Sequence, residues 1–195
     1  MVCTLTGLIG GIDEAGRGPL AGPVVSSCVV WKGLPPDRPK GIDDSKLLTP
    51  RQRSELFPWI RKNAFAVGIG IATHEEIDTI NILRASLLSM ERALEESGTE
   101  PDLLLVDGKF GLRSHPRCKP VIKGDRKCFY VACASIVAKV VRDSIMDTYG
   151  LDYPQYHFKK NKGYPTKDHK LAIERYGISP IHRKTFRGVR EHLAI

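Results

Sequence analysis

The hydrophobic residues of this chain follow two patterns. Some form short unbroken runs, and others recur at spacings of three and four residues. The short runs predict five strands, at residues 7–12, 24–31, 65–72, 103–106 and 120–122. The repeats, together with capping residues, predict four helices, which begin at Thr49, Thr73, Lys127 and Thr166. Early strands followed by helices that alternate with short buried strands predict a mixed α/β sheet.

Two of the helix starts carry a complete capping signal. Thr49 is followed by Pro50 and Gln52, and Thr73 is followed by Glu76, so each threonine opens a capping box. The helix that begins at Thr73 is expected to run unbroken to Gly98. The third helix is expected over residues 127–149 and the last over 166–176.

The length of 195 residues predicts a single catalytic domain, with a core at about 1–150 and a basic helical extension at about 151–195. No apolar run approaches the ~18–20 residues that span a bilayer, and the first nine residues lack the features of a signal peptide. The five cysteines are odd in number and contain no C-x-x-C pair. We therefore expect a cytoplasmic protein without a membrane partner, and a monomer.

Charge is distributed unevenly along the chain. Residues 1–116 carry 13 Lys and Arg against 15 Asp and Glu, a net charge of −2. Residues 117–195 carry 17 against 7, a net charge of +10. A basic half beside a mildly acidic half suggests a polyanionic partner such as nucleic acid, although a basic surface also serves solubility alone.

Four acids follow apolar strands or lie between elements: Asp13, Glu14, Asp107 and Asp125. Ligand sites gather at strand ends, where loops present side chains on a rigid base. Carboxylates without Cys or His nearby suit Mg²⁺ or Mn²⁺. Two such ions, about 4 Å apart, activate water and stabilise a leaving oxygen in phosphodiester hydrolysis. Each acid alone has a common explanation as a solvated surface or turn residue.

The stretch GGIDEAGRGPLAGPVV sets two acids before a glycine-rich turn. In an unbroken strand, Asp13 and Glu14 face opposite sides. We expect the chain to leave the strand at Glu14, so that both acids reach one metal centre. Gly16 and Gly18 permit such a bend, and Arg17 then contacts phosphate, or else only faces solvent in a tight turn.

Several blocks, in this order, resemble the type 2 ribonucleases H (ribonuclease HII) of bacteria. They are GIDEAGRGPLAGPVV, DDSKLL, INILRAS, LLVDG, IKGDRK, ACASIVAKVVRD, NKGYPT and HRKTF, and they cover nearly the whole chain. The resemblance implies a ribonuclease H-like fold, a mixed five-stranded sheet flanked by helices with a C-terminal helical extension. Asn161, where relatives often have histidine, and Cys133, where many have alanine, depart from the family pattern.

The resemblance also implies an activity. It is metal-dependent cleavage of the RNA strand in RNA–DNA hybrids and incision 5′ of single ribonucleotides in duplex DNA, as in ribonucleotide excision repair. The products would be 5′-phosphate and 3′-hydroxyl ends. No sliding-clamp motif is expected from the ending REHLAI, nor the extra N-terminal domain of the type 3 enzymes.

The family pattern further implies roles for individual residues. The acids at Asp13, Glu14, Asp107 and Asp125 would hold the metals. Backbone groups of Gly16, Arg17 and Gly18 would sense the ribose 2′-hydroxyl, and Tyr164 would stack on the sugar.

Three further cations are candidate contacts to nucleic acid. Lys46 lies in the loop block DDSKLL and suits a phosphate contact. Lys139 lies about twelve residues, or roughly 18 Å, into the long helix, so it is expected to touch the duplex or brace the fold without joining the metal centre. Arg183 is a further candidate for phosphate, or simply a surface residue.

Two rival functions stay open from the residues alone. One is another two-metal nuclease, such as a DNA resolvase or exonuclease, which activity on an all-DNA duplex would favour. The other is a noncatalytic module that binds RNA–DNA hybrids, which predicts binding that survives EDTA and no product. The complete set of four acids argues against the second.

Overall fold

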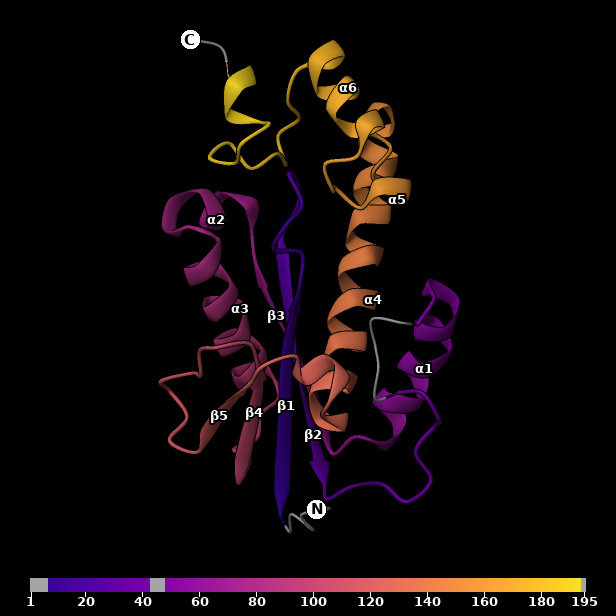
Figure 1. The fold of residues 1–195 in the computed structure, drawn as a ribbon, viewed down its shortest axis with the longest axis vertical. Coiled ribbons are helices and arrows are strands. Elements are labelled where there is room, and N and C mark those ends of the chain that lie inside the picture. The colour runs from indigo at the N-terminus through magenta and orange to yellow at the C-terminus, as the bar shows by residue number, and fades with distance from the viewer. Residues whose placement is uncertain (1–6, 43–47, 194–195) are drawn as a thin grey trace.

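The computed structural model describes residues 7–42 and 48–193, which build one five-stranded sheet with helices on both faces (Figure 1). The strands are β1 (Leu8–Ala15), β2 (Val24–Lys32), β3 (Ala66–Ala72), β4 (Leu103–Asp107) and β5 (Cys118–Val121). Their order in the sheet is β3-β2-β1-β4-β5. β2 is antiparallel to β1 and β3, whereas β4 is parallel to β1 and β5. The predicted mixed five-stranded sheet is confirmed.

Helices cover the two faces of the sheet in separate groups. One face carries α1 (Pro50–Asn63) and α4 (Phe129–Asp152), and the other carries α2 (His74–Ile80) and α3 (Ile82–Glu96) (Figure 1). A short turn, η1 (Gly124–Arg126), joins β5 to α4. The remaining elements are η2 (Pro154–Tyr156), α5 (Phe158–Asn161), α6 (Lys167–Tyr176) and η3 (Arg190–His192). No described helix is long and apolar enough to cross a membrane.

Three of the four predicted helix starts are confirmed, whereas the long helix begins at Phe129, two residues later than predicted, and ends at Asp152. One predicted helix is broken. Thr49 and Thr73 both form the expected capping boxes, and Thr166 caps α6. The helix expected to run from Thr73 to Gly98 divides into α2 and α3 at Asn81, whose φ is +68°. The Asn81 side chain accepts hydrogen bonds from the amides of Leu83 and Arg84 in α3, so the residue that ends one helix also caps the next.

Helix α4 packs closely against strand β1, because β1 has a glycine at the point of contact. Gly11 of β1 faces the first turn of α4, and a Cβ there would overlap the backbone of Tyr130. Farther out in the same layer, Trp31 stacks on Trp59 of α1 and meets Phe129 of α4, with ring centroids 5.6 and 5.1 Å apart. This packing holds α4 along β1, toward the end of the strand that carries the acids.

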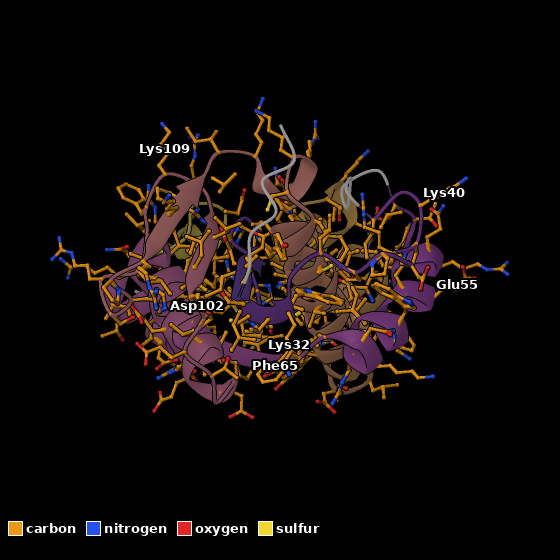
Figure 2. All side chains as sticks on the ribbon, turned by 90° about the horizontal axis from the view of Figure 1, so that it is seen from below. Lys32, Lys40, Glu55, Phe65, Asp102 and Lys109 are labelled. Atoms are coloured by element: carbon orange, nitrogen blue, oxygen red, sulfur yellow. The ribbon has the colours of Figure 1, made fainter. Side chains whose placement is uncertain are left out.

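The opposite end of β1 lies at the base of the molecule. Lys32 pairs with Leu8 there, and its ammonium lies 4.6 Å from the centroid of the Phe65 ring (Figure 2). Lys40, Glu55 and Lys109 extend outward around this end (Figure 2). The acids Asp13 and Glu14 therefore lie at the other end of the strand, toward the C-terminal segment.

The residues after α4 pack on an apolar cluster that they share with the rest of the chain. Tyr156, Phe158 and Ile173 are buried in it together with Leu20 of the glycine-rich turn and Met146 of α4. The C-terminal segment thus lies directly against the turn that follows the two acids of β1 (Figure 1).

Candidate active site

A cavity of about 390 Å³ opens where the carboxyl ends of β1 and β4 meet α4. Its wall holds three acids, the glycine–arginine turn, several cations and one tyrosine, namely Asp13, Glu14, Ala15, Gly16, Arg17, Gly18, Arg53, Asp107, Ser135, Lys139 and Tyr164. Most of the residues singled out in the sequence are therefore brought to one place, although they come from distant parts of the chain.

Strand β1 continues through both acids, and the expected departure of the chain at Glu14 is wrong. Asp13 pairs with Ser27 of β2, and the pairing extends to Ala15. On the other side, β4 pairs with β1 only as far as Ile12. The end of β1 therefore has an open edge that borders the cavity, which explains how both acids line it although alternate strand positions face apart.

Asp13 is a buried carboxyl group with two other acidic side chains nearby. Burial raises the pKa of Asp13 well above its usual range, and the nearby carboxylates of Glu14 and Asp107 raise it further. The Glu14 amide, which donates to Oδ1 of Asp13 at 2.7 Å, and the nearby Ser135 hydroxyl oppose that rise. The strand thus holds a carboxylate that ionises reluctantly in the absence of a cation.

Glu14 lies in a similar position but has one cationic partner. Burial raises the pKa of Glu14, and the guanidinium of Arg17, 3.2 Å from Oε1, partly offsets this. The second oxygen, Oε2, is buried and has no hydrogen-bond partner among the described residues. A buried carboxylate oxygen without a partner is costly unless a cation or another donor satisfies it.

Asp107 and Asp125 are connected through one backbone amide. Asp107 ends β4, and its Oδ1 accepts a hydrogen bond of 2.7 Å from the amide of Gly124. Asp125 is the next residue, in η1, and it is fully buried. The structure therefore brings three of the four predicted acids into the cavity wall, and the fourth lies next to it, outside the lining.

The donors in the cavity wall fit a hard divalent cation. They are carboxylate and hydroxyl oxygens, and neither Cys nor His is among the lining residues. A cation would satisfy the bare oxygen of Glu14 and relieve the repulsion around Asp13. Across the residues that the structure describes, no three His, Cys, Asp or Glu side chains already form a metal-binding group. The case for a divalent cation therefore rests on the type of donor atoms and on the closeness of the acidic side chains.

The turn after β1 needs glycine at its first position. Gly16 has a φ of +103°, and a Cβ on it would overlap the side chain of Arg142. Arg142, on α4, is fully buried and donates hydrogen bonds to the carbonyls of Pro23, Ala21 and Lys162 at 3.0–3.2 Å. The hydrogen bonds of Arg142 thus hold the turn against α4.

Arg183 is also buried against this turn, which contradicts the predicted phosphate contact. Its side chain has no exposed surface, and its guanidinium donates to four backbone carbonyls at 2.6–3.2 Å, those of Gly16, Arg17, Gly22 and Pro23. A side chain enclosed in this way supports the turn from inside and does not reach a ligand in the cavity.

Lys139 lies in the cavity wall together with the acids, and its expected role as a contact to the duplex stays a prediction. It reaches the cavity because α4 runs along β1. Tyr130 lies against Gly11, and Ser135 lies near Asp13, so one further helical turn brings Lys139 to the cavity. Its ammonium pairs with Asp143 at 2.7 Å.

Tyr164 lies in the cavity wall and is half-exposed, at 41%. The ammonium of Lys139 is 5.8 Å from the ring centroid. A Cβ on Gly18 would be 3.7 Å from the ring edge, so the tyrosine stands next to the glycine–arginine turn.

Two buried histidines hold the backbone of Tyr164. The Ser179 amide donates to Nδ1 of His182 at 2.9 Å, and Nδ1 of His169 donates to the Tyr164 carbonyl at 2.9 Å. Because these contacts fix the outer nitrogens, His182 donates through Nε2 to Nε2 of His169, 3.0 Å away. Burial lowers the pKa of both rings, that of His182 to about 4, which keeps the pair neutral.

Arg53 is a cavity residue that the sequence reasoning does not single out. It lies in the first turn of α1, and its Nη1 donates to the carbonyl of Leu48 at 2.5 Å. The available signal is its place one turn after the Thr49 cap, directly behind the block DDSKLL. Lys46, the predicted phosphate contact in that block, lies outside the described residues.

Comparisons with known proteins agree with the resemblance. The sequence model of the Ribonuclease HII family matches residues 10–189. Ribonuclease HII of Clostridioides difficile is 52% identical over 91% of this chain and 69% of that protein, and that of Geobacter sulfurreducens is 51% identical over 95% and 84%. The crystal structure of ribonuclease H2 from Pyrococcus horikoshii superposes with a TM-score of 0.76, at 27% identity, over 94% of this chain and 96% of that one. The chain therefore belongs to the ribonuclease HII family.

Proposed function

We propose that the cavity at the end of β1 is the active site at which this chain hydrolyses RNA. Enzymes of the ribonuclease HII family are endonucleases that cut the RNA strand of RNA–DNA hybrids and cut at single ribonucleotides in duplex DNA. The observation that carries the assignment is the meeting of Asp13, Glu14 and Asp107 in one cavity lined by cations.

The four acids are the proposed metal ligands. Asp13, Glu14 and Asp107 would hold divalent cations, with Asp125 beside them, and we propose two ions, either Mg²⁺ or Mn²⁺. Such ions activate a water molecule for attack and stabilise the leaving oxygen of a phosphodiester. The chain contributes the placement of the ligands, since the amide of Glu14 donates to Asp13 and the amide of Gly124 donates to Asp107.

Three cations in the cavity wall are the proposed phosphate contacts. Arg17, Arg53 and Lys139 come from the turn after β1, from α1 and from α4, and they line the same cavity as the acids. Charge-assisted hydrogen bonds from Arg and Lys to phosphate oxygens are strong, and those from Arg are directional. Arg17 and Lys139 each have an acidic partner already, so a phosphate would compete with Glu14 and Asp143 for them.

The ribose is proposed to lie between Tyr164 and the glycine–arginine turn. The half-exposed ring of Tyr164 offers a flat apolar face to a sugar, and Gly18 stands close to the edge of that ring. Backbone groups of residues 16–18 would then meet the 2′-hydroxyl, the only group that separates ribose from deoxyribose. The cut is proposed on the 5′ side of the ribonucleotide, leaving 5′-phosphate and 3′-hydroxyl ends.

The C-terminal segment is proposed to belong to the same catalytic domain as the sheet. Its apolar residues share one cluster with Leu20, Ala21 and Met146, and Arg183 from this segment bonds to the turn of the active site. We therefore expect that removing it damages the active site as well as the fold.

A substitution at Asp107 tests the proposed site. Asp107→Asn keeps the size of the side chain and leaves an oxygen to accept from the Gly124 amide, but it removes the charge. We expect turnover on a duplex with one ribonucleotide to fall on the order of a hundredfold or more at saturating metal. The matched control is Asp152→Asn, at an exposed acid at the end of α4, which should cut like the wild type. Near-wild-type turnover by the Asp107→Asn protein would exclude Asp107 as a metal ligand.

A further inference from the structure

The inner side of the glycine–arginine turn is occupied by a buried cation. The guanidinium of Arg183 donates through Nη2 to the carbonyl of Gly16 at 2.6 Å and through Nη1 to the carbonyl of Arg17 at 3.0 Å. These are consecutive peptide groups. Arg183 lies far along the chain, in the C-terminal segment, and reaches the turn only because that segment packs on it.

The direction of the two carbonyls determines the direction of two amides. In a planar trans peptide the C=O of one residue and the N–H of the next point to opposite sides, and no described peptide bond is cis. When Arg183 draws the carbonyls of Gly16 and Arg17 inward, the amides of Arg17 and Gly18 must point outward. Both residues line the cavity on that outer side.

These two amides are available to a ligand. Neither the Arg17 amide nor the Gly18 amide has a hydrogen-bond partner within residues 7–42 and 48–193. Adjacent amides that point the same way form a concave donor site for an oxygen atom. The ring of Tyr164 stands beside Gly18, so an oxygen bound there would belong to a group held against that ring.

We propose that Arg183 is a positioning residue for ribose recognition. By holding the carbonyls of Gly16 and Arg17, it aims the amides of Arg17 and Gly18 at the 2′-hydroxyl oxygen of the substrate. This inference rests on the proposed function of the cavity and goes beyond it, because it assigns the orientation of the ribose-sensing turn to a residue that never touches the substrate.

Arg142 extends the same arrangement to Tyr164. It donates to the carbonyls of Ala21 and Pro23 in the turn and to the carbonyl of Lys162, two residues before Tyr164. The two buried arginines therefore set the amides and the tyrosine ring at a fixed separation.

Arginine is needed here for its shape as well as its charge. Arg183 uses three nitrogens at once in a planar fork, which the single ammonium of lysine cannot reproduce. Burial lowers the pKa of Arg183 to about 9, so keeping the charge inside the protein is costly. Buried ionic groups are often replaceable by apolar ones without loss of stability, which favours a reason for this arginine other than stability alone.

The experiment compares binding to two duplexes that differ by one oxygen atom. Equilibrium dissociation constants are measured in EDTA, which prevents cleavage, for an all-DNA duplex and for the same duplex with one ribonucleotide. The proteins are the wild type, Arg183→Lys, and Arg187→Lys as a matched control at an exposed arginine of the same segment. The readout is the ratio of the two constants, which a partly unfolded sample does not change.

We expect the wild type and Arg187→Lys to prefer the ribonucleotide duplex equally. Arg183→Lys should lose about five- to tenfold of that preference, the effect of misaligning two hydrogen bonds, and should bind the all-DNA duplex as before. Should Arg183→Lys fail to fold, the apolar substitution Arg183→Met takes its place in the same comparison, with the same expected direction. A preference that persists unchanged in the folded variants would overturn the inference, whereas equal binding of both duplexes by the wild type would overturn ribose recognition at this turn itself.

Discussion

At the scale of single residues, burial acts on the acids and the arginines of this site in opposite directions. It raises the pKa of Asp13 and lowers that of Arg183 to about 9, in each case because a buried charge is poorly solvated. Backbone carbonyls compensate Arg183 within the fold itself. The Glu14 amide and the Arg17 guanidinium compensate Asp13 and Glu14 only in part, and the remaining cost is the physical reason to place a cation between them.

The crowding around Asp13 predicts how stability changes with pH in metal-free buffer. A carboxyl group whose pKa is higher in the folded protein stabilises the fold below its unfolded value of about 3.8, and this stabilisation is lost as pH rises through the folded pKa. Asp13→Asn should therefore raise the free energy of unfolding in EDTA at pH 7 and change it little at pH 4. Thermal melts of both proteins at the two pH values measure this difference.

The Asp13 prediction has a built-in control. Saturating Mg²⁺ should stabilise the wild type and reduce or reverse the advantage of the Asp13→Asn protein, because the cation removes the repulsion that the substitution removes. An Asp13→Asn protein that melts below the wild type in EDTA at pH 7 would contradict the proposed crowding.

Tyr164 is predicted to act through its ring. Stacking of an aromatic ring on a nucleotide contributes about 1–3 kcal/mol, so Tyr164→Ala should lower activity on the order of 10–100-fold, whereas Tyr164→Phe should keep most of it. Rates on a duplex with one ribonucleotide and on a continuous hybrid, together with a melting curve for each variant, make the measurement. The loss should be larger for the single ribonucleotide, since a continuous hybrid offers other registers. Equal losses with a large fall in melting temperature would indicate that Tyr164 packs the turn onto the core instead.

At the scale of elements, local patterns predicted the strands and three of the helix starts, because caps and apolar runs act over a few residues. The break at Asn81 escaped prediction because the apolar repeat continues from Ile80 to Leu83 on both sides of it. The continuation of β1 through Glu14 was not predicted, because pairing with β2 keeps the chain extended where the glycines of the sequence suggest a bend.

The parts of the site that the sequence could not place depend on long-range contacts. The acids, the glycine–arginine turn and Tyr164 stand out as motifs, and the structure brings all but Asp125 into one cavity wall. Arg183 reads as a surface cation, since nothing local reveals that the carbonyls of Gly16 and Arg17, more than 160 residues away, enclose it. The position of Lys139 likewise follows from the packing of α4 along β1, which has no signature in the helix itself.

At the scale of the whole molecule, the charge asymmetry bears on substrate binding. Residues 117–195 carry a net charge of +10 and include Lys139. We expect binding of an RNA–DNA hybrid to weaken steeply with salt, with a log–log slope of roughly −0.7 to −0.9 for each phosphate contact. Phosphate contacts by Arg17, Arg53 and Lys139 alone predict a total slope of about −2, measured in EDTA between dilute and physiological salt, and contacts by the other cations of the basic half would make the slope steeper. A slope no steeper than about −2 would mean that the rest of this charge is ordinary surface.

The central claim is that the protein, at this cavity and with a divalent metal ion, hydrolyses the phosphodiester bond beside a ribonucleotide. The most direct measurement incubates the protein with a DNA duplex that contains one ribonucleotide, with Mg²⁺ or with Mn²⁺, and maps the cut on a sequencing gel. The account predicts one cut on the 5′ side of the ribonucleotide, with 5′-phosphate and 3′-hydroxyl ends, none in EDTA and none in the all-DNA duplex. Product formation in EDTA, or equal cutting of the all-DNA duplex, would contradict it.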